Sequence, residues 1–433
     1  MSGKRNKNSY DRPSAQPYIA FTEEMRDSGY TLLVPNMLPM QFKLIIQVLR
    51  NRGYKIDLME TQGPHIAETG LRYVHNDTCY PAILVIGQFI DALQSGRYDP
   101  HKVALVLAQT GGGCRASNYI SLLRKALVKA GYGYVPVISF SVAGIEKHPG
   151  FKLTLPILIR MFFGIIYGDL LMSLVNQTEP YEAVPGTAQA LADRYTKELV
   201  ECMDRDGASF PKVKKNCKKI LSDFAAIERR PNAHRKVRVG VVGEIYVKFS
   251  PLGNNNLSQF LLDNGAEAVI PGLVDFILYC IYNNLMDHEL YGAGGWSYPI
   301  WKAVWKYLTA KQRELIALIR EDGRFDAPTP IEETIALIQK HMSMGIKMGE
   351  GWLLPAEMLE LYTHGTKNIV CTQPFGCLPN HICGKGMMKP LRDAYPDINI
   401  VAIDYDAGAT RVNQENRLKL MLANAKGDRT SIE

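Results

Sequence analysis

The chain has 433 residues, which is too long for one ordinary domain and predicts two or three. Apolar residues make up 46% and charged residues 21%, a composition typical of a protein with buried cores. The net charge of +7 is spread over the N-terminal segment and two basic runs, 212–219 and 234–238, with no aromatic residues interleaved. We interpret these runs as solvated faces and expect no nucleic-acid partner.

The first half of the chain alternates short apolar runs with amphipathic segments. Strands are expected at residues 30–35, 55–60, 102–110 and 134–140, and helices at 39–53, 81–96 and 118–131. This alternation indicates βαβ units and a parallel sheet. We therefore expect a polar N-terminal tail over residues 1–27 and a first α/β domain over residues 28–152.

Residues 153–235 are expected to form a helical connector. Its first part, 153–175, is the most apolar stretch of the chain, but Arg160 and Asp169 interrupt it and would be costly at bilayer depth. A buried helix is the better interpretation, and we expect no membrane association. Residues 1–16 have no apolar core, so we expect no secretory signal and a cytoplasmic location.

A second alternation opens at residues 237–247 and predicts a second α/β domain over residues 236–424, followed by a tail over 425–433. A helical, aromatic-rich insertion is expected at 273–320. Strands are expected at 367–373 and 399–406, and helices at 381–396 and 413–425. The expected fold is thus two Rossmann-like or flavodoxin-like parallel-sheet domains joined by a helical connector.

Three of the eight cysteines lie where open α/β sheets place their ligands, at carboxyl ends of strands or at helix N-termini: Cys79, Cys114 and Cys377. Helix N-termini favour thiolates, so we expect lowered cysteine pKa values there. Without an export signal, a disulfide framework is not indicated. Packing or surface roles are expected for Cys202, Cys217 and Cys280. Cys371 and Cys383 flank the Cys377 loop, and for these two both alternatives stay open: ligation of a metal, or a position beside the ligands.

Glycines precede two of these cysteines, Gly112 and Gly113 before Cys114 and Gly376 before Cys377. The loop "TGGGCR" is neither a P-loop nor a GxGxxG fingerprint. Glycines let backbone approach a bulky inorganic group and donate N–H bonds to its sulfides, and cysteine thiolates hold iron. Zinc fits less well, because there is no CxxC pair and the candidate ligands are scattered along the chain.

Five ordered segments carry a resemblance to a known family: "NDTCYPAILVIGQFIDAL", "QTGGGCRASNYISLLRKAL", "VVGEIYVKFSPLGNNNL", "GEGWLLPAEM" and residues 371–422. Together they resemble the 2-hydroxyacyl-CoA dehydratase component family, in particular the branch otherwise found fused behind ATP-dependent activase domains. The resemblance runs from about residue 28 to residue 424. Activase domains themselves do not occur in this chain.

The resemblance implies an iron–sulfur cluster in the cleft between the two α/β domains, held by Cys79, Cys114 and Cys377. It implies a 4Fe–4S cluster, or a double-cubane cluster as in relatives that reduce small molecules. In the dehydratases, a separate ATP-hydrolysing activator delivers one electron through the cluster to an acyl-CoA thioester, which then loses a β-placed hydroxide. A lyase or an oxidoreductase of this type would need such an activator as a partner.

Polar residues near these loops are candidates for contacts with a cluster or a substrate. Arg115 follows Cys114 and could balance thiolate and sulfide charge; its alternative is a surface salt bridge. Glu244 follows a strand at the place where cleft residues lie. Weaker candidates, which can equally be turn or cap residues, are 254–256, Glu350, Asp404 and Asp406.

Two other functions stay open. One is a non-catalytic electron relay or scaffold that holds a cluster, and the other is a cluster-free α/β protein whose glycine loop binds phosphate or CoA. A relay usually has four thiolate ligands, whereas chemistry needs an iron with a replaceable ligand. We expect three ligands, with the open iron near Arg115 and Glu244. We also expect a homodimer, or a heterodimer with a related subunit, and consider the basic connector 212–238 as an activator-docking surface.

Overall fold

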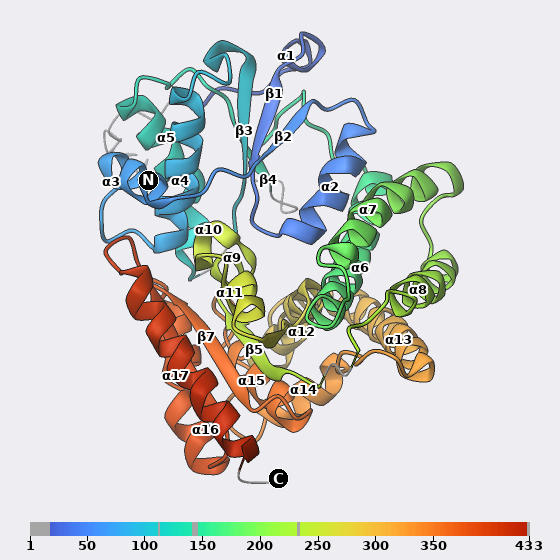
Figure 1. The fold of residues 1–433 in the computed structure, drawn as a ribbon. Coiled ribbons are helices and arrows are strands. Elements are labelled where there is room, and N and C mark those ends of the chain that lie inside the picture. The colour runs from blue at the N-terminus through green and yellow to red at the C-terminus, as the bar shows by residue number, and fades with distance from the viewer. Residues whose placement is uncertain (1–17, 111–112, 141–145, 232–233, 431–433) are drawn as a thin grey trace, which may run out of the picture.

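A computed structural model describes residues 18–430 apart from 111–112, 141–145 and 232–233. It contains two four-stranded parallel sheets, one in each half of the chain, with helices packed against them (Figure 1). In this view the first sheet lies in the upper part of the molecule and the second in the lower part, with the connector helices to the right. The expected class, two Rossmann-like α/β units, is confirmed.

The first sheet has the strand order β2-β1-β3-β4. Leu33 of β1 pairs with Leu105 of β3, which pairs with Val137 of β4, so these three form a row on one face of the sheet. This row packs against α4 and α5, because alternate residues of a strand point to opposite faces. The elements of this domain are α1 (Glu23–Asp27), β1 (Thr31–Pro35), α2 (Pro39–Arg50), β2 (Ile56–Met59), α3 (Pro64–Tyr73), α4 (Tyr80–Gln94), η1 (Pro100–Lys102), β3 (Val103–Ala108), η2 (Arg115–Asn118), α5 (Tyr119–Lys129) and β4 (Val137–Phe140).

The connector consists of α6 (Leu155–Thr178), α7 (Thr187–Asp206) and α8 (Phe210–Ala225), which pack on the α2 side of the first domain. Among the described residues, α6 is the helix long and apolar enough to span a membrane, but half of its most apolar window is buried inside the protein. Asp169 of α6 accepts hydrogen bonds from Gln41 Nε2 at 2.7 Å and from the backbone N–H of Val274 at 2.8 Å. Asp169, which interrupts the apolar run in the sequence, therefore connects α6 to α2 and to the start of α12.

The second sheet has the order β6-β5-β7-β8, which repeats the relative order of the first. The insertion between β6 and β7 is larger than expected, because it includes two helices, α14 and α15, beyond the predicted 273–320 segment. The elements of this domain are β5 (Val237–Gly243), α9 (Ile245–Phe249), α10 (Pro251–Asn254), α11 (Leu257–Asp263), β6 (Ala266–Val269), α12 (Leu273–Tyr291), α13 (Tyr298–Asp322), α14 (Ile331–Ile338), α15 (Leu353–Thr363), β7 (Asn368–Pro374), the π-helix η3 (Asn380–Lys385), α16 (Met388–Ala394), β8 (Asn399–Tyr405) and α17 (Arg411–Thr430).

One hydrophobic core crosses from the first domain to the second. It joins α4, α5 and one face of β1 and β3 to residues of β5, α9, α11, β8 and α17. Two further cores lie on the outer faces, one shared with the connector and one under α12, α14 and α15. Because the domains share buried apolar surface, the loops at their facing edges are held in fixed positions relative to one another.

The two ends of the chain are more structured than expected. Phe21 is buried and Thr22 caps α1, so ordered structure begins inside the segment 1–27 that was expected to be a tail. Helix α17 continues to Thr430, past the boundary expected at residue 424.

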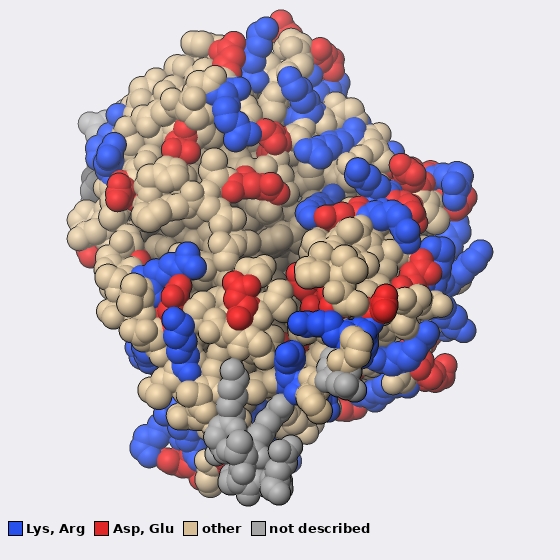
Figure 2. All heavy atoms as spheres, viewed as in Figure 1, with Lys and Arg blue, Asp and Glu red and all other residues tan. Residues whose placement is uncertain are grey.

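Basic and acidic side chains are interspersed over the connector side of the molecule, at the right of Figure 2. Lys214 of the basic connector pairs with Glu314, and Lys219 pairs with Asp223. This mixed surface agrees with the interpretation of the basic runs as solvated faces.

Candidate metal centre

Each sheet has a topological switch point, between β1 and β3 in the first domain and between β5 and β7 in the second. Ligands of open α/β sheets bind at the carboxyl ends of the strands beside such a point. The glycine loop with Cys114 follows β3, Glu244 follows β5, and Cys377 follows β7. Three of the residues selected from the sequence are thus at the predicted edge of the two sheets.

Cys79 is the N-cap of α4, which has Pro81 in its first turn. The loop after β7 lies directly against it: the N–H of Tyr80 donates to the carbonyl of Phe375 at 2.9 Å. Gly376 has a φ of +73°, and a Cβ at this position would lie 3.0 Å from the Cα of Cys79. Gly376 is therefore required both for its backbone conformation and for this close approach between the domains.

Cys114 is the N-cap of η2, and its Sγ accepts from the N–H of Ala116 at 3.5 Å. The N–H of Gly113, which was expected to face a cofactor, donates instead to Met348 Sδ at 3.2 Å. A Cβ on Gly113 would lie 2.9 Å from the same sulfur, so a side chain there would displace Met348. Gly112 lies outside the described residues.

The three thiols lie close enough that the charge of Cys114 acts on the pKa of both Cys79 and Cys377. Burial raises the pKa of Cys79 to about 11 and also raises the pKa values of Cys114 and Cys377. The expected lowering at helix N-termini is therefore wrong, because loss of solvation outweighs the hydrogen bonds from backbone N–H groups. Cys79 and Cys377 are buried, whereas Cys114 is partly exposed, so the site opens beside Cys114.

The donor set of the candidate metal centre consists of three cysteine thiols. Among the described residues, no group of three or more His, Cys, Asp or Glu side chains is close enough to hold one metal ion. Ligands of an iron–sulfur cluster bind different irons, so they do not have to meet at one point. Three cysteines that approach from two domains, with a glycine at the closest backbone contact, are compatible with a bulky inorganic group.

Two carboxyl groups lie at the turn after β5. Glu244 is the N-cap of α9 and accepts from the N–H of Val247 at 3.0 Å, while Glu350 accepts from the N–H of Ile245 at 3.1 Å. Burial and the charge of Glu350 raise the pKa of Glu244 to about 8. The charges of both carboxyl groups also act on the pKa of Cys377. Glu244 is thus a proton-bearing group beside the three thiols at neutral pH.

Arg115 is exposed, and its Nη1 donates to the backbone carbonyl of Asp77 at 2.5 Å. It thereby joins the turn of Cys114 to the loop that precedes Cys79. Among the described residues the structure gives it no carboxylate partner, so the alternative of a surface salt bridge is not what the structure contains.

Sequence reasoning missed two side chains of this site. The Oη of Tyr119, a buried residue at the start of α5, lies 3.1 Å from the Sγ of Cys79. Cys280 of α12 is exposed, and the charge of Glu350, which acts on the pKa of Cys377, acts on the pKa of Cys280 as well. Tyr119 could have been noticed as an aromatic residue near the start of the helix after Cys114, but nothing in the sequence links Cys280 to the site.

The remaining cysteines and weaker candidates are placed as follows. Cys371 in β7 and Cys383 in η3 are buried behind the loop of Cys377, and burial raises their pKa values to about 12 and about 11. Cys217 lies in the connector core, and Cys202 is within 3.5 Å of Asp206. The other polar candidates bond to protein groups: Asn254 donates to the carbonyl of Val247, Asn255 to Gln414 Oε1 and Asn256 to Gln62 Oε1, and Asp404 pairs with Lys385.

A scan of the sequence against models of protein families found no match, and a search of curated proteins found none either.

Proposed function

We propose that this chain is an iron–sulfur protein of the 2-hydroxyacyl-CoA dehydratase type. The observation that carries the proposal is the approach of three thiols from two domains where the carboxyl ends of the two sheets face one another, with Gly376 against Cys79. Cys79, Cys114 and Cys377 would hold a 4Fe–4S cluster or one half of a double-cubane cluster. Such a cluster supplies a low-potential electron for reductive chemistry on an acyl-CoA thioester or a small molecule.

The carboxyl groups beside the thiols supply proton chemistry. Because the pKa of Glu244 is raised to about 8, this carboxyl group keeps its proton at neutral pH. The N–H of Val247 donates to Oε2 at 3.0 Å, and the N–H of Tyr246 also hydrogen-bonds to this carboxyl group. A protonated acid at this position can donate to a leaving hydroxide. Exposed Arg115 at the opening offers positive charge to the phosphate groups of a CoA substrate.

The glycine loop does not have the P-loop pattern, so the proposal places ATP hydrolysis on a partner rather than at this loop. We propose a separate ATP-hydrolysing activator in the cytoplasm, and a homodimer or a heterodimer with a related subunit. Exposed apolar side chains near Cys377 and Gly113 provide a docking surface. This docking surface consists of Met348, Phe375, Leu378 and Ile382.

The proposal is tested by anaerobic purification followed by an iron and sulfide count per chain and by EPR spectroscopy of the reduced protein. We expect cluster iron and a low-potential EPR signal. Turnover is then measured with reduced activator, ATP and candidate acyl-CoA thioesters. A chain that binds no iron even after anaerobic reconstitution would leave only the cluster-free phosphate- or CoA-binding function.

A relay is the second candidate, and exposed Cys280 is the observation that favours it. A fourth thiol would complete the coordination that keeps a relay cluster inert. Cyanide distinguishes the two functions: it perturbs the EPR spectrum if one iron has a replaceable ligand. It leaves the spectrum unchanged if four thiolates bind, and Cys280→Ala would then create sensitivity to cyanide.

A further inference from the structure

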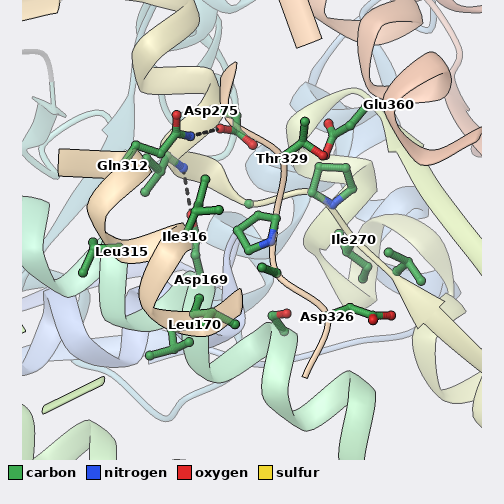
Figure 3. Close-up of a pocket in the computed structure, with 18 of the residues that line it drawn as sticks. Asp169, Leu170, Ile270, Asp275, Gln312, Leu315, Ile316, Asp326, Thr329 and Glu360 are labelled. Carbon is green, nitrogen blue, oxygen red and sulfur yellow. Dashed lines mark hydrogen bonds between the residues drawn. The ribbon is translucent and has the colours of Figure 1, made fainter. Parts of the chain in front are cut away.

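A cavity of about 350 Å³ lies at the carboxyl end of β6, between α6, α12, α13 and α15 (Figure 3). Its walls are largely apolar and include Leu170, Ile270, Leu315 and Ile316, while segment 326–329 covers one side. None of the three cysteines of the candidate metal centre lines it. The volume falls in the usual range for small-molecule sites.

Two buried carboxyl groups face this apolar space. Asp275 of α12 and Glu360 of α15 are each only 8% exposed, and their carboxyl groups point toward one another across the position of Thr329 (Figure 3). Gln312 Nε2 donates to one oxygen of Asp275 at 2.8 Å, and Thr329 hydrogen-bonds to Glu360. Glu360 accepts from both the hydroxyl and the backbone N–H of Thr329, and a carboxylate offers about four acceptor sites. Each therefore keeps acceptor capacity directed into the cavity.

The basic side chains around the cavity already have partners. Lys248, a buried cation whose charge acts on both acids, binds the two oxygens of Glu357 at 2.8 Å and 3.0 Å. Arg238 pairs with Glu267 at 3.3 Å and with Asp326 at 3.0 Å. Arg235, which also lines the cavity, pairs with Asp326 as well. Among the described residues these three cations thus pair with other carboxylates, while Asp275 and Glu360 share a low-dielectric space, which is costly for two carboxylates.

We propose that this cavity binds a small organic cation, a primary amine with an apolar chain, whose ammonium group lies between Asp275 and Glu360. An ammonium group has three N–H donors, which match the free acceptor positions of the two acids. The apolar chain packs against Leu170, Ile270 and Ile316, which line the cavity.

Binding to the full-length protein is measured by isothermal titration calorimetry at pH 8 with hexylamine as the probe, compared with hexanol and hexanoate. We expect hexylamine to bind, hexanol to bind at least about tenfold more weakly because it lacks the charge-assisted hydrogen bonds, and hexanoate not to bind. Equal affinities of hexylamine and hexanol would overturn the proposal, as would an absence of hexylamine binding.

Variants locate the binding. Glu360→Gln and Asp275→Asn should each weaken hexylamine about tenfold or more while leaving hexanol unchanged, and Ile316→Phe should block both probes by filling the cavity. Glu333→Gln, an exposed acid on α14, is the matched control and should change nothing. A Glu360→Gln protein that folds and binds hexylamine as tightly as the original would show that the acids are protonated structural groups. Because the cavity is separate from the cysteines, iron content should be unaffected, and this result is independent of the proposed function.

Discussion

The Cα of Cys79 lies 3.0 Å from the position that a Cβ on Gly376 would occupy, so a glycine of the second domain sets the distance to a cysteine of the first. The neighbouring hydrogen bond from Tyr80 to Phe375 fixes the same contact through the backbone. The geometry of the candidate metal centre therefore depends on how closely the two domains meet.

Gly376→Ala should lower the iron content of the anaerobically purified protein and reduce its free energy of unfolding. The positive φ alone costs about 1 kcal/mol for alanine, and the contact with Cys79 adds to it. Gly365→Ala is the matched control, because Gly365 has a φ of +81° with nothing within 4 Å of the added Cβ. Iron counts and urea unfolding measure both effects; equal behaviour of the two variants would contradict the role of the contact.

Replacing each loop cysteine should remove or destabilise the cluster. Cys79→Ala, Cys114→Ala and Cys377→Ala are expected to lose most of their iron and sulfide, whereas Cys371→Ala and Cys383→Ala should keep the EPR spectrum nearly unchanged. Cys217→Ala controls for lost packing, because Cys217 is buried in the connector core. Iron that survives all three loop substitutions would show that the ligand assignment is wrong.

Tyr119→Phe should lower the reduction potential of the bound cluster without removing it. The Oη of Tyr119 lies 3.1 Å from Cys79 Sγ, and a hydrogen bond to a ligating sulfur stabilises the more negative, reduced state. Tyr167→Phe is the control, since Tyr167 is a buried tyrosine that accepts from Asn216 in the connector. Redox titration followed by EPR gives both potentials, and an unchanged Tyr119→Phe potential would argue against a hydrogen bond to a ligand.

Glu360 should make the protein less stable as the pH rises. Burial raises its pKa to about 7 in the folded protein, so the folded state holds this proton more tightly than the unfolded state does. The contribution of Glu360 to the free energy of unfolding is greatest below the pKa that it has in the unfolded chain. This contribution is lost as the pH rises through about 7. Glu360→Gln should flatten the profile and raise the unfolding free energy at pH 8 by about 2 to 3 kcal/mol.

Urea unfolding between pH 5 and pH 8, with Glu333→Gln as the exposed control, measures this difference. Parallel profiles of Glu360→Gln and the unchanged protein would contradict it.

Activator docking can be assigned to one of two surfaces. Leu378→Asp, in the exposed apolar group beside Cys377, should slow activator-dependent reduction while the cluster content stays the same. Lys215→Glu with Lys218→Glu tests the basic connector, where both lysines are exposed. Stopped-flow reduction rates decide between them: slowing by the lysine reversals alone would place the activator on the connector.

The alternation of strands and helices could be predicted because period-2 and period-3.6 apolar patterns are local properties of the chain. β1, β3, β5 and β7 all lie where apolar runs indicated strands. The pattern alone is less informative at residues 245–249, where the apolar run after β5 continues but forms α9, because the side chain of Glu244 caps a new helix.

The candidate site was predictable only in part. Glycine and cysteine at the ends of strands pointed to the sheet edge, but the raised pKa values of the thiols depend on burial by residues distant in sequence. The same holds for the contact between Gly113 and Met348 and for the facing of Asp275 and Glu360. Such relationships arise from packing between segments that are distant in the sequence, for which a single sequence has no local pattern.

The division of the cysteines between the domains has a consequence for biosynthesis. Cys79 and Cys114 belong to the domain that leaves the ribosome first, whereas Cys377 lies in the second domain and emerges later. A cluster that needs all three could not be completed on the nascent first domain. In the proposed cluster protein, cofactor delivery would have to follow translation of both domains, so an iron donor would have to recognise a protein whose two domains have already met.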